Sequence, residues 1–222
     1  ENSWRDLVLG SYPITPATQI LEALSKYKNF NIKTVQAEDE IAAVGIALGA
    51  AYTGNLGVTT TSGPGLALKS ETIGLAVMSE LPLIVINVMR AGPSTGMPTK
   101  TEQSDLLQAY FGRNGESPLV ILAASSPSDC FNTAFEAARI AIRFRTPVIV
   151  LSDSYLANGS ETWNVPEVSQ LPDISVEPIR HGERYVPYAR HPETLARRLA
   201  IPGRTGFEHR IGGLEKNEAG QV

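Results

Sequence analysis

The sequence has a single cysteine, Cys130, among its 222 residues. One cysteine cannot form a disulfide within the chain, and an iron–sulfur cluster needs about four protein ligands. We therefore expect any redox cluster that works with this chain to be held by another subunit.

The sequence also lacks an excess of basic charge and long apolar runs. Its 19 Lys and Arg are outnumbered by 23 Asp and Glu, and no basic run is present that would follow a phosphate backbone. No apolar stretch reaches the roughly 18 residues of a membrane-spanning helix, and the first residues lack the layout of a signal peptide. We expect no nucleic-acid partner, no membrane partner and a cytoplasmic location.

Histidines are equally scarce. The three present, His181, His191 and His209, all lie near the end of the sequence, and no group of His, Cys and carboxylates has metal-binding spacing. A metal site within this chain is therefore not expected. Hydrolase chemistry is disfavoured as well, because there is no GxSxG motif and no histidine close to a candidate strand.

What the sequence does contain is an alternation of short β-branched or apolar runs with longer alanine-rich segments of helical period. The runs expected to form strands are 7–9, 33–36, 57–61, 83–89, 119–123 and 148–151, and the expected helices are 17–27, 40–52, 67–79, 102–111 and 128–144. This alternation is typical of βαβ units. We predict an α/β fold, with an open, mostly parallel sheet of about six strands and helices on both faces.

The expected helix 40–52 and the segment after 157 differ in texture. In the helix, Ile41, Val44, Gly45, Leu48 and Tyr52 follow helical spacing, so we expect this face to pack against the sheet. From Asn158 onward prolines recur and neither periodicity persists. We therefore expect one domain at 1–157 and an extended proline-rich tail or linker at 158–222, lying toward a second domain or a partner subunit.

Ligands bind beyond the carboxyl ends of the strands in an open parallel sheet, so the turns after the strands are the candidate sites. After the first strand, two prolines stiffen the turn Tyr12-Pro13-Ile14-Thr15-Pro16 and Thr15 offers a fixed hydroxyl. The structural alternative is a helix start, with Thr15 as N-cap and Pro16 at the first helical position.

Three acids, Glu38, Asp39 and Glu40, follow the second strand. Acids are common at helix N-termini because the unpaired amides and the helix dipole favour negative charge there, so a capping role is the structural alternative. Glu40, however, adjoins the apolar helix IAAVGIALGAA, where desolvation would favour a protonated carboxyl. We predict that Glu40 is the acid suited to proton transfer.

The third and fourth turns carry glycines, hydroxyls and an arginine. Ser62-Gly63-Pro64-Gly65 lets the backbone approach a ligand closely, although it lacks the GxGxxG spacing and could equally be a tight βα turn. Arg90 ends the most apolar strand, and its permanent charge requires an anion or carbonyl groups. We predict that Arg90 grips a substrate carboxylate, with a contact to loop carbonyls or a subunit as the alternative, and that Gln103 and Asp105 line the same crevice.

Together, the motifs SYPITPAT, QAEDEIAAVGIALGA, TTTSGPGLAL, RAGPSTGMPTKTEQSDL and TGFEHRIGGLEK resemble the α subunit of 2-oxoacid:ferredoxin oxidoreductases. The resemblance spans nearly the whole sequence. The closing motif and the PSTGMPT loop are more similar to the 2-oxoglutarate branch than to the pyruvate enzymes. The resemblance implies a thiamine-diphosphate-binding fold in which this domain faces the aminopyrimidine ring of the cofactor.

The resemblance also implies roles for individual residues. Glu40 falls on the catalytic glutamate beside the ring, whose proton exchange with a ring nitrogen leads to the reactive ylid. Thr15 and Arg90 fall on positions that hold the 2-oxoacid. The neighbouring turns would contact the cofactor through Tyr12, Pro13, Ser62 and Gly63.

The implied reaction is oxidative decarboxylation of a 2-oxoacid, most simply 2-oxoglutarate, with electrons passing to ferredoxin and the acyl group to coenzyme A. The resemblance implies a β subunit that binds the diphosphate and Mg²⁺ and carries the iron–sulfur cluster, so that thiamine diphosphate is shared between subunits. The family's second α/β domain does not follow the proline-rich segment, so we expect this sequence to be part of a longer chain.

Two other functions remain open at this point. The domain could belong to another thiamine-diphosphate enzyme, such as a pyruvate or branched-chain 2-oxoacid oxidoreductase or a transketolase-like enzyme. It could also be a non-catalytic assembly module, although a scaffold would need neither Glu40 nor Arg90.

Overall fold

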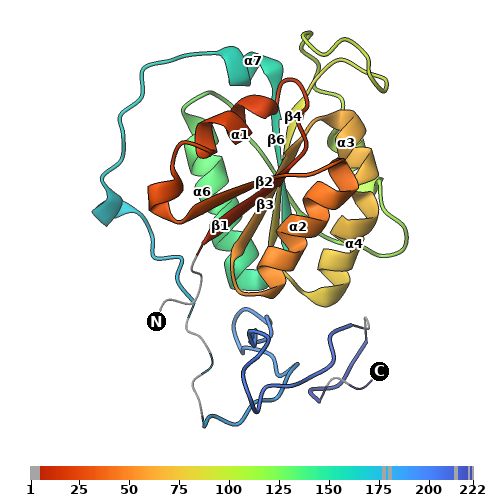
Figure 1. Cartoon of the computed structure of the whole chain (residues 1–222), viewed down its shortest axis with the longest axis vertical. Helices are drawn as coiled ribbons and strands as arrows, with labels where there is room; N and C mark the ends of the chain where they lie inside the picture. The colour runs from red at the N-terminus through yellow and green to blue at the C-terminus, as the bar shows by residue number, and fades with distance from the viewer. Residues whose placement is uncertain (1–5, 177–178, 180–181, 213–214, 220, 222) are drawn as a thin grey trace.

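A computed structural model describes residues 6–176, 179, 182–212, 215–219 and 221. The parts of the expected tail at 177–178, 180–181 and 213–214, which include His181 and two residues of the closing motif, lie outside the described residues. The centre of the fold is a six-stranded sheet in the order β2-β1-β3-β4-β6-β5, in which neighbouring strands run parallel (Figure 1). The strands are β1 (Leu7–Ser11), β2 (Ile32–Gln36), β3 (Leu56–Thr61), β4 (Leu83–Met89), β5 (Val120–Ala123) and β6 (Pro147–Asp153).

Helices cover both faces of this sheet, as predicted. In Figure 1, α1 and α6 lie on one side of the sheet and α2, α3 and α4 on the other. The helices are α1 (Thr18–Leu24), α2 (Glu40–Tyr52), α3 (Gly63–Leu68), α4 (Ser70–Ser79), α5 (Leu106–Phe111), α6 (Asp129–Phe144) and α7 (Ser154–Asn158), with short 3-10 helices η1 (Lys28–Phe30) and η2 (Val168–Gln170). The sequence-based prediction of the fold class is confirmed.

Two apolar cores result from alternation along the central strands. Leu83 and Val85 of β4 contribute to the core under α2 and α4, whereas Ile84 contributes to the core under α6. Successive side chains of a strand point to opposite faces, so a continuously apolar strand supplies both cores at once. This is why the most apolar runs occupy the centre of the sheet.

The helix α2 packs on the sheet with a face that differs in part from the predicted one. Val44 and Leu48 of the predicted face are buried, and alanines and Glu40 form the rest of the buried side. Ile41 and Tyr52 are about half exposed. The cause is the close approach of α2 to β1 and β3, where a side chain at Gly10 or Gly57 would collide with the backbone carbonyl of Ala43 or Ala47. Alanines therefore take the inner face, together with Glu40.

Several predicted boundaries also shift. The helix expected at 67–79 is two helices, α3 and α4, and α3 already begins at Gly63, with Pro64 in its first turn. Proline suits that position because its missing N–H would have no partner there. The helix expected from 102 begins only at Leu106. The strand β6 is followed by α7, a short helix that the sequence analysis did not predict.

The structural alternative for the first turn is also wrong. The helix α1 begins at Thr18, with Ala17 as its N-cap, so Thr15 and Pro16 precede the helix instead of starting it. The peptide bond between them is cis, and Ala17 is buried. Thr15 therefore belongs to the turn and does not cap the helix.

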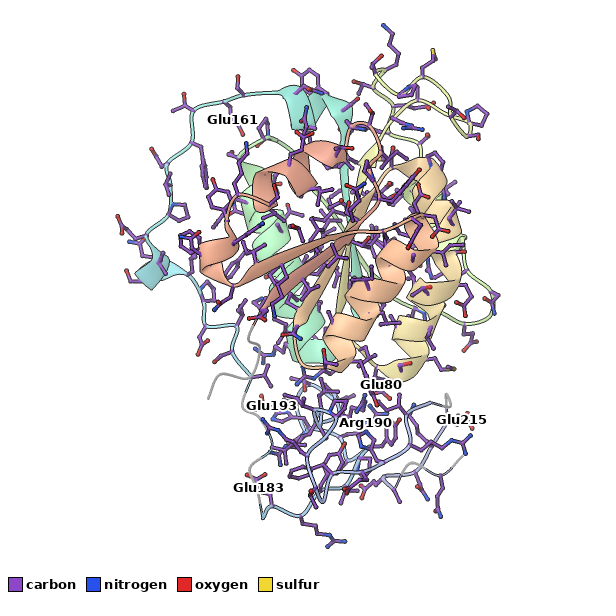
Figure 2. All side chains as sticks on the ribbon, viewed as in Figure 1. Glu80, Glu161, Glu183, Arg190, Glu193 and Glu215 are labelled. Carbon is purple, nitrogen blue, oxygen red and sulfur yellow. The ribbon has the colours of Figure 1, made fainter. Side chains whose placement is uncertain are left out.

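Beyond Asn158 the described residues contain η2 as their one regular element, and the chain returns to the sheet as a small lobe (Figure 1). Arg197 of the lobe is fully buried and donates to the carbonyl of Ser79 at the end of α4. Figure 2 marks Glu80 and Arg190 where the lobe meets α4, and their side chains form an ion pair that Lys216 joins at 3.3 Å.

Charge pairing at Glu80 outweighs burial. Burial by itself would raise the pKa of Glu80, but the hydrogen bond and charge of Arg190, together with Lys216, hold that pKa below its usual range. The ionised carboxylate therefore holds the lobe at the amino ends of the strands, opposite the candidate site. Among the residues that the structure describes, no helix combines the length and apolar character required to span a bilayer.

Candidate active site

The candidate site lies where the direction of strand addition reverses. The chain adds β2 on one side of β1 and β3 on the other, and ligands of open parallel sheets bind beyond the carboxyl ends of strands at such a switch point. At this end of the sheet, β1 and β3 are joined by a 3.0 Å hydrogen bond between the hydroxyls of Ser11 and Thr60. The turns after β1, β2 and β3 therefore meet at one edge.

Arg90 connects the first turn to the loop after β4. Its side chain is buried and donates from Nη1 to the carbonyl oxygen of Thr15 at 2.7 Å and from Nη2 to that of Thr95 at 3.3 Å. The sequence-based alternative of a contact to loop carbonyls is thus observed. The buried Nε has no acceptor among the described residues. Thr15 itself is exposed, as is Tyr12, while Pro13 is partly buried.

Glu40 is the first residue of α2, and its side chain is buried against the start of α3. A Cβ atom at Gly65 would lie 2.8 Å from Cγ of Glu40 and 3.1 Å from its Oε1, and would collide with the hydroxyl of Thr61. The absence of a side chain at Gly65 is therefore what leaves room for the carboxyl. In the described part of the chain, no hydrogen bond to that carboxyl is found.

The neighbouring acid, Asp39, has a different task. It is the N-cap of α2, and its carboxylate accepts a 2.7 Å hydrogen bond from the backbone N–H of Ala42. The capping role that was one alternative for the acidic turn thus belongs to Asp39, which leaves Glu40 free of it. Glu38 is exposed.

Buried polar atoms without a hydrogen-bond partner gather beside this edge. Within the described residues they include the hydroxyls of Thr59 and Ser62 and the Oδ1 of Asn87. Because unpaired buried polar groups are unfavourable and rare, such a group near a strand end indicates a place for a ligand or a partner. Ser62 is the residue that precedes α3, and its side chain does not cap that helix.

A cleft of about 800 Å³ opens beside Arg90, between the start of α3 and the segment that leads into α5. Its lining includes Gly63 and Asp105, whose carboxylate also accepts a 2.8 Å hydrogen bond from Asn87. Gln103 is not among the lining residues, and its side chain donates instead to Asp153 at the end of β6. The structure therefore places Asp105, but not Gln103, in the crevice with Arg90.

Two polar residues of this region escaped the sequence analysis. Lys69 is fully buried at the junction of α3 and α4, and its ammonium donates to the backbone carbonyl of Glu40 at 2.9 Å. Asn87 is also fully buried, two residues before the end of β4. A signal for Lys69 was present, since it stands four residues before the buried Ile73 and therefore on the inner stripe of the helix.

The residues at this edge suit an organic cofactor better than a metal ion. Across the described ranges, no group of three or more His, Cys, Asp and Glu side chains could hold a metal. A buried carboxyl without a hydrogen-bond partner, a glycine that leaves space beside it and the unpaired hydroxyl of Ser62 fit a ring that offers a polar nitrogen. The sequence-based expectation is the aminopyrimidine ring of thiamine diphosphate, and the assignment of these residues to it stays a prediction.

Comparison with known proteins agrees with this geometry. Residues 6–222 match the family model described as pyruvate flavodoxin/ferredoxin oxidoreductase, thiamine diphosphate-binding. The 2-oxoglutarate oxidoreductase subunit KorA of Mycobacterium tuberculosis is 64% identical over 217 residues, which is 97% of this chain and 33% of that protein. The 2-oxoglutarate synthase subunit KorA of Archaeoglobus fulgidus is 42% identical, covering 72% of this chain and 46% of that protein.

A solved structure is also similar, that of 2-oxoglutarate:ferredoxin oxidoreductase from Magnetococcus marinus with 2-oxoglutarate, coenzyme A and succinyl-CoA bound. It superposes with a TM-score of 0.89 and 39% sequence identity, covering 99% of this chain and 38% of that one. The chain thus spans between about a third and a half of the length of these relatives. It belongs to the thiamine diphosphate-binding family of pyruvate flavodoxin/ferredoxin oxidoreductases.

Proposed function

We propose that this chain is the pyrimidine-side, thiamine-diphosphate-engaging part of the α subunit of a 2-oxoacid:ferredoxin oxidoreductase, most specifically one that acts on 2-oxoglutarate. The observation that carries the proposal is the buried Glu40, whose carboxyl faces Gly65 without a hydrogen-bond partner at the switch point of the sheet. The similarity to 2-oxoglutarate enzymes over nearly the whole chain supports the choice of substrate.

In this proposal Glu40 donates a proton from its free carboxyl to a ring nitrogen of the cofactor and later takes it back. The ring would be contacted by Tyr12 and Pro13 after β1 and by Ser62 and Gly63 at the start of α3. When bound, thiamine diphosphate supplies the carbon nucleophile and the electron sink for decarboxylation. Burial of most of the Glu40 residue lowers the local dielectric constant, which would strengthen its interaction with the ring.

Thr15 and Arg90 are proposed to hold the 2-oxoacid. The contact between the Arg90 guanidinium and the Thr15 carbonyl already fixes the two residues side by side, so little ordering remains to be done when substrate binds. The Nε of Arg90, which has no acceptor among the described residues, and the remaining N–H groups of its guanidinium can donate to a carboxylate.

The overall reaction needs groups that we place on partners. The bond between the 2-oxoacid's carboxylate and carbonyl carbons breaks to release CO₂, electrons pass to ferredoxin, and the acyl group passes to coenzyme A. Mg²⁺, the diphosphate site and the iron–sulfur cluster are proposed to reside on a β subunit, which shares the cofactor with this chain. A cytoplasmic location is part of the same proposal.

The test is CoA-dependent reduction of ferredoxin, or of a viologen dye, by the complete α subunit produced together with its β subunit. We expect turnover with 2-oxoglutarate and weaker turnover with pyruvate. Arg90→Ala should raise the KM for the 2-oxoacid roughly 10- to 100-fold, the size expected for loss of hydrogen bonds to a charged group, whereas Arg143→Ala, at an exposed arginine of α6, should not.

Two outcomes would redirect the proposal. Faster turnover with pyruvate or a branched-chain 2-oxoacid would keep the enzyme class and change the substrate. Reduction of NAD, or sugar transfer without ferredoxin reduction, would assign the domain to another thiamine-diphosphate enzyme. Cofactor binding without any turnover would favour the non-catalytic assembly module.

A further inference from the structure

Lys69 is a charged residue in a place where packing alone calls for an apolar one. Its side chain is fully buried between α2 and α4, and its neighbours along the inner stripe, Ile73 and Ala76, belong to the apolar core. Lysine is almost never fully buried unless its charge has a partner, because desolvation of an ammonium is unfavourable. The partner of Lys69 is therefore informative.

That partner is Glu40, the proposed catalytic residue. The Lys69 ammonium donates to the Glu40 backbone carbonyl at 2.9 Å. This contact brings a positive charge to the N-terminal turn of α2, which is the end of a helix where a cation is disfavoured by the helix dipole. The position is unfavourable for Lys69 on both counts, so an ordinary packing role does not explain it.

Burial and the surrounding carboxylates act on the pKa of Lys69 in opposite directions. Burial lowers the pKa of Lys69 from 10.5 to about 8, while the charges of Glu40 and Asp39 act to raise it. Attraction between charges is mutual, so the Lys69 ammonium can stabilise the negative charge that develops on Glu40 as its proton moves to the ring. A methionine at this position would fill similar space without this effect.

Other charged groups at this edge already have partners or face solvent. Asp39 is bound to the N–H of Ala42, Asp105 to Asn87, and Arg90 to the carbonyls of Thr15 and Thr95. Glu71 in the first turn of α4 is exposed. Lys69 is therefore well placed to act on Glu40, whose carboxyl has no hydrogen bond within the described residues.

We propose that Lys69 is a positioning residue that fixes the first turn of α2 and supplies the positive charge that promotes proton transfer from Glu40 to the bound cofactor ring. This inference rests on the proposed function, since it assigns Lys69 a role in activating thiamine diphosphate. Lys69 touches neither cofactor nor substrate in this scheme and acts through Glu40.

The experiment measures exchange of the thiazolium C2 proton with deuterated solvent, in the complete enzyme loaded with thiamine diphosphate and without 2-oxoacid. Lys69→Met is compared with Lys69→Arg, which keeps the charge, and with Lys26→Met, which removes an exposed lysine of the loop after α1. Cofactor affinity by calorimetry and the melting temperature of the cofactor-free enzyme are measured for each variant.

We expect Lys69→Met to slow the exchange roughly tenfold at pH 7, less than the full attraction of an adjacent charge because the proton-transfer step feels only part of it, with melting temperature and cofactor affinity unchanged or increased. In the wild type, exchange should also decline above about pH 8, as Lys69 loses its proton, and this decline should be absent in Lys69→Met. Lys69→Arg should retain most of the exchange and Lys26→Met all of it.

Two results would overturn the inference. One is a Lys69→Met enzyme with unchanged exchange and an unchanged pH profile. The other is slower exchange accompanied by a lower melting temperature and weaker cofactor binding, which would show that Lys69 only supports the fold. A wild-type enzyme that binds no thiamine diphosphate would instead refute the proposed function itself, and with it this inference.

Discussion

The two helical layers cover the same sheet but differ in the charge that they bury. The layer of α2, α3 and α4 buries Glu40 and Lys69 beside the switch point, whereas α6 in the opposite layer has its ion pair, Glu136 with Arg139, partly exposed and buries a charged residue at its C-cap, Arg145, at the far end of the helix. Both layers pack on apolar strands, so neither layer needs a buried charge in order to pack. In the proposed function, the charged groups buried beside the switch point serve the chemistry, and their burial carries a cost in stability.

The largest effect is expected from Glu40→Gln, which removes the proposed proton-transfer group while preserving its shape. We expect ferredoxin or dye reduction by the complete enzyme to fall roughly 100-fold or more, as is typical when a proton-transfer residue is lost. Glu136→Gln in the opposite layer is the matched control and should leave the rate unchanged. Full activity of Glu40→Gln would remove Glu40 from the mechanism.

Lys69→Met should next reveal the cost of the buried charge. The folded-state pKa of about 8 lies below the usual 10.5, so the folded protein binds the Lys69 proton less tightly than the unfolded chain. The loss of folding stability caused by burying the charged Lys69 is complete below about pH 8 and declines as the pH rises toward 10.5. We expect the variant to be more stable at pH 7, by up to about 3 kcal/mol, in denaturant unfolding; equal stability of the two proteins from pH 7 to 10 would contradict this.

Gly65→Ala tests whether space beside Glu40 matters. The new methyl group would press on Glu40 and collide with the Thr61 hydroxyl, so we expect a loss of about 1 to 3 kcal/mol in unfolding free energy and slower turnover. Gly74→Ala in α4, where a methyl group would meet no neighbour, should instead stabilise the protein by roughly 0.5 to 1 kcal/mol. If both substitutions changed the unfolding free energy equally, the close contact between position 65 and Glu40 would not affect stability.

The smallest effect is expected in the opposite layer, from Arg139→Met. Its ion pair with Glu136 is largely exposed, with 31% and 40% of the side chains accessible, so solvent screens the attraction. We expect the unfolding free energy to change by about 0.5 kcal/mol or less. A change as large as that of Lys69→Met, in either direction, would show that the two layers do not differ in the way described.

Much of the fold could be predicted from the sequence because its signals are local. Continuous apolar runs such as 83–89 indicated central strands, and each strand of the sheet was anticipated within a few residues. Glu40 and Arg90 could be singled out for the same reason, since both follow a strand and the carboxyl ends of parallel strands share an edge. Their contact roles stay predictions, because neither a cofactor nor a substrate is present to touch them.

Other features depended on contacts that local patterns do not record. The inner face of α2 was predicted only in part: Val44 and Leu48 are buried, but alanines replace Ile41 and Tyr52, because glycines in β1 and β3 bring the helix close to the sheet. Glu40 can lie inward because Gly65 of α3 leaves room for its side chain. The split between α3 and α4, and with it the burial of Lys69, likewise escaped detection, since a lysine within a helical pattern usually indicates a solvent-facing position.

The sequence by itself determined the class of fold, the edge of the sheet that carries the site and the family resemblance, because hydrophobic periodicity and the residues after each strand are properties of short segments. Only the tertiary structure decided which acid caps α2 and which is buried, and that the Lys69 ammonium meets the Glu40 carbonyl. Those outcomes depend on how closely the helices approach the sheet, which is set by residues distant in sequence.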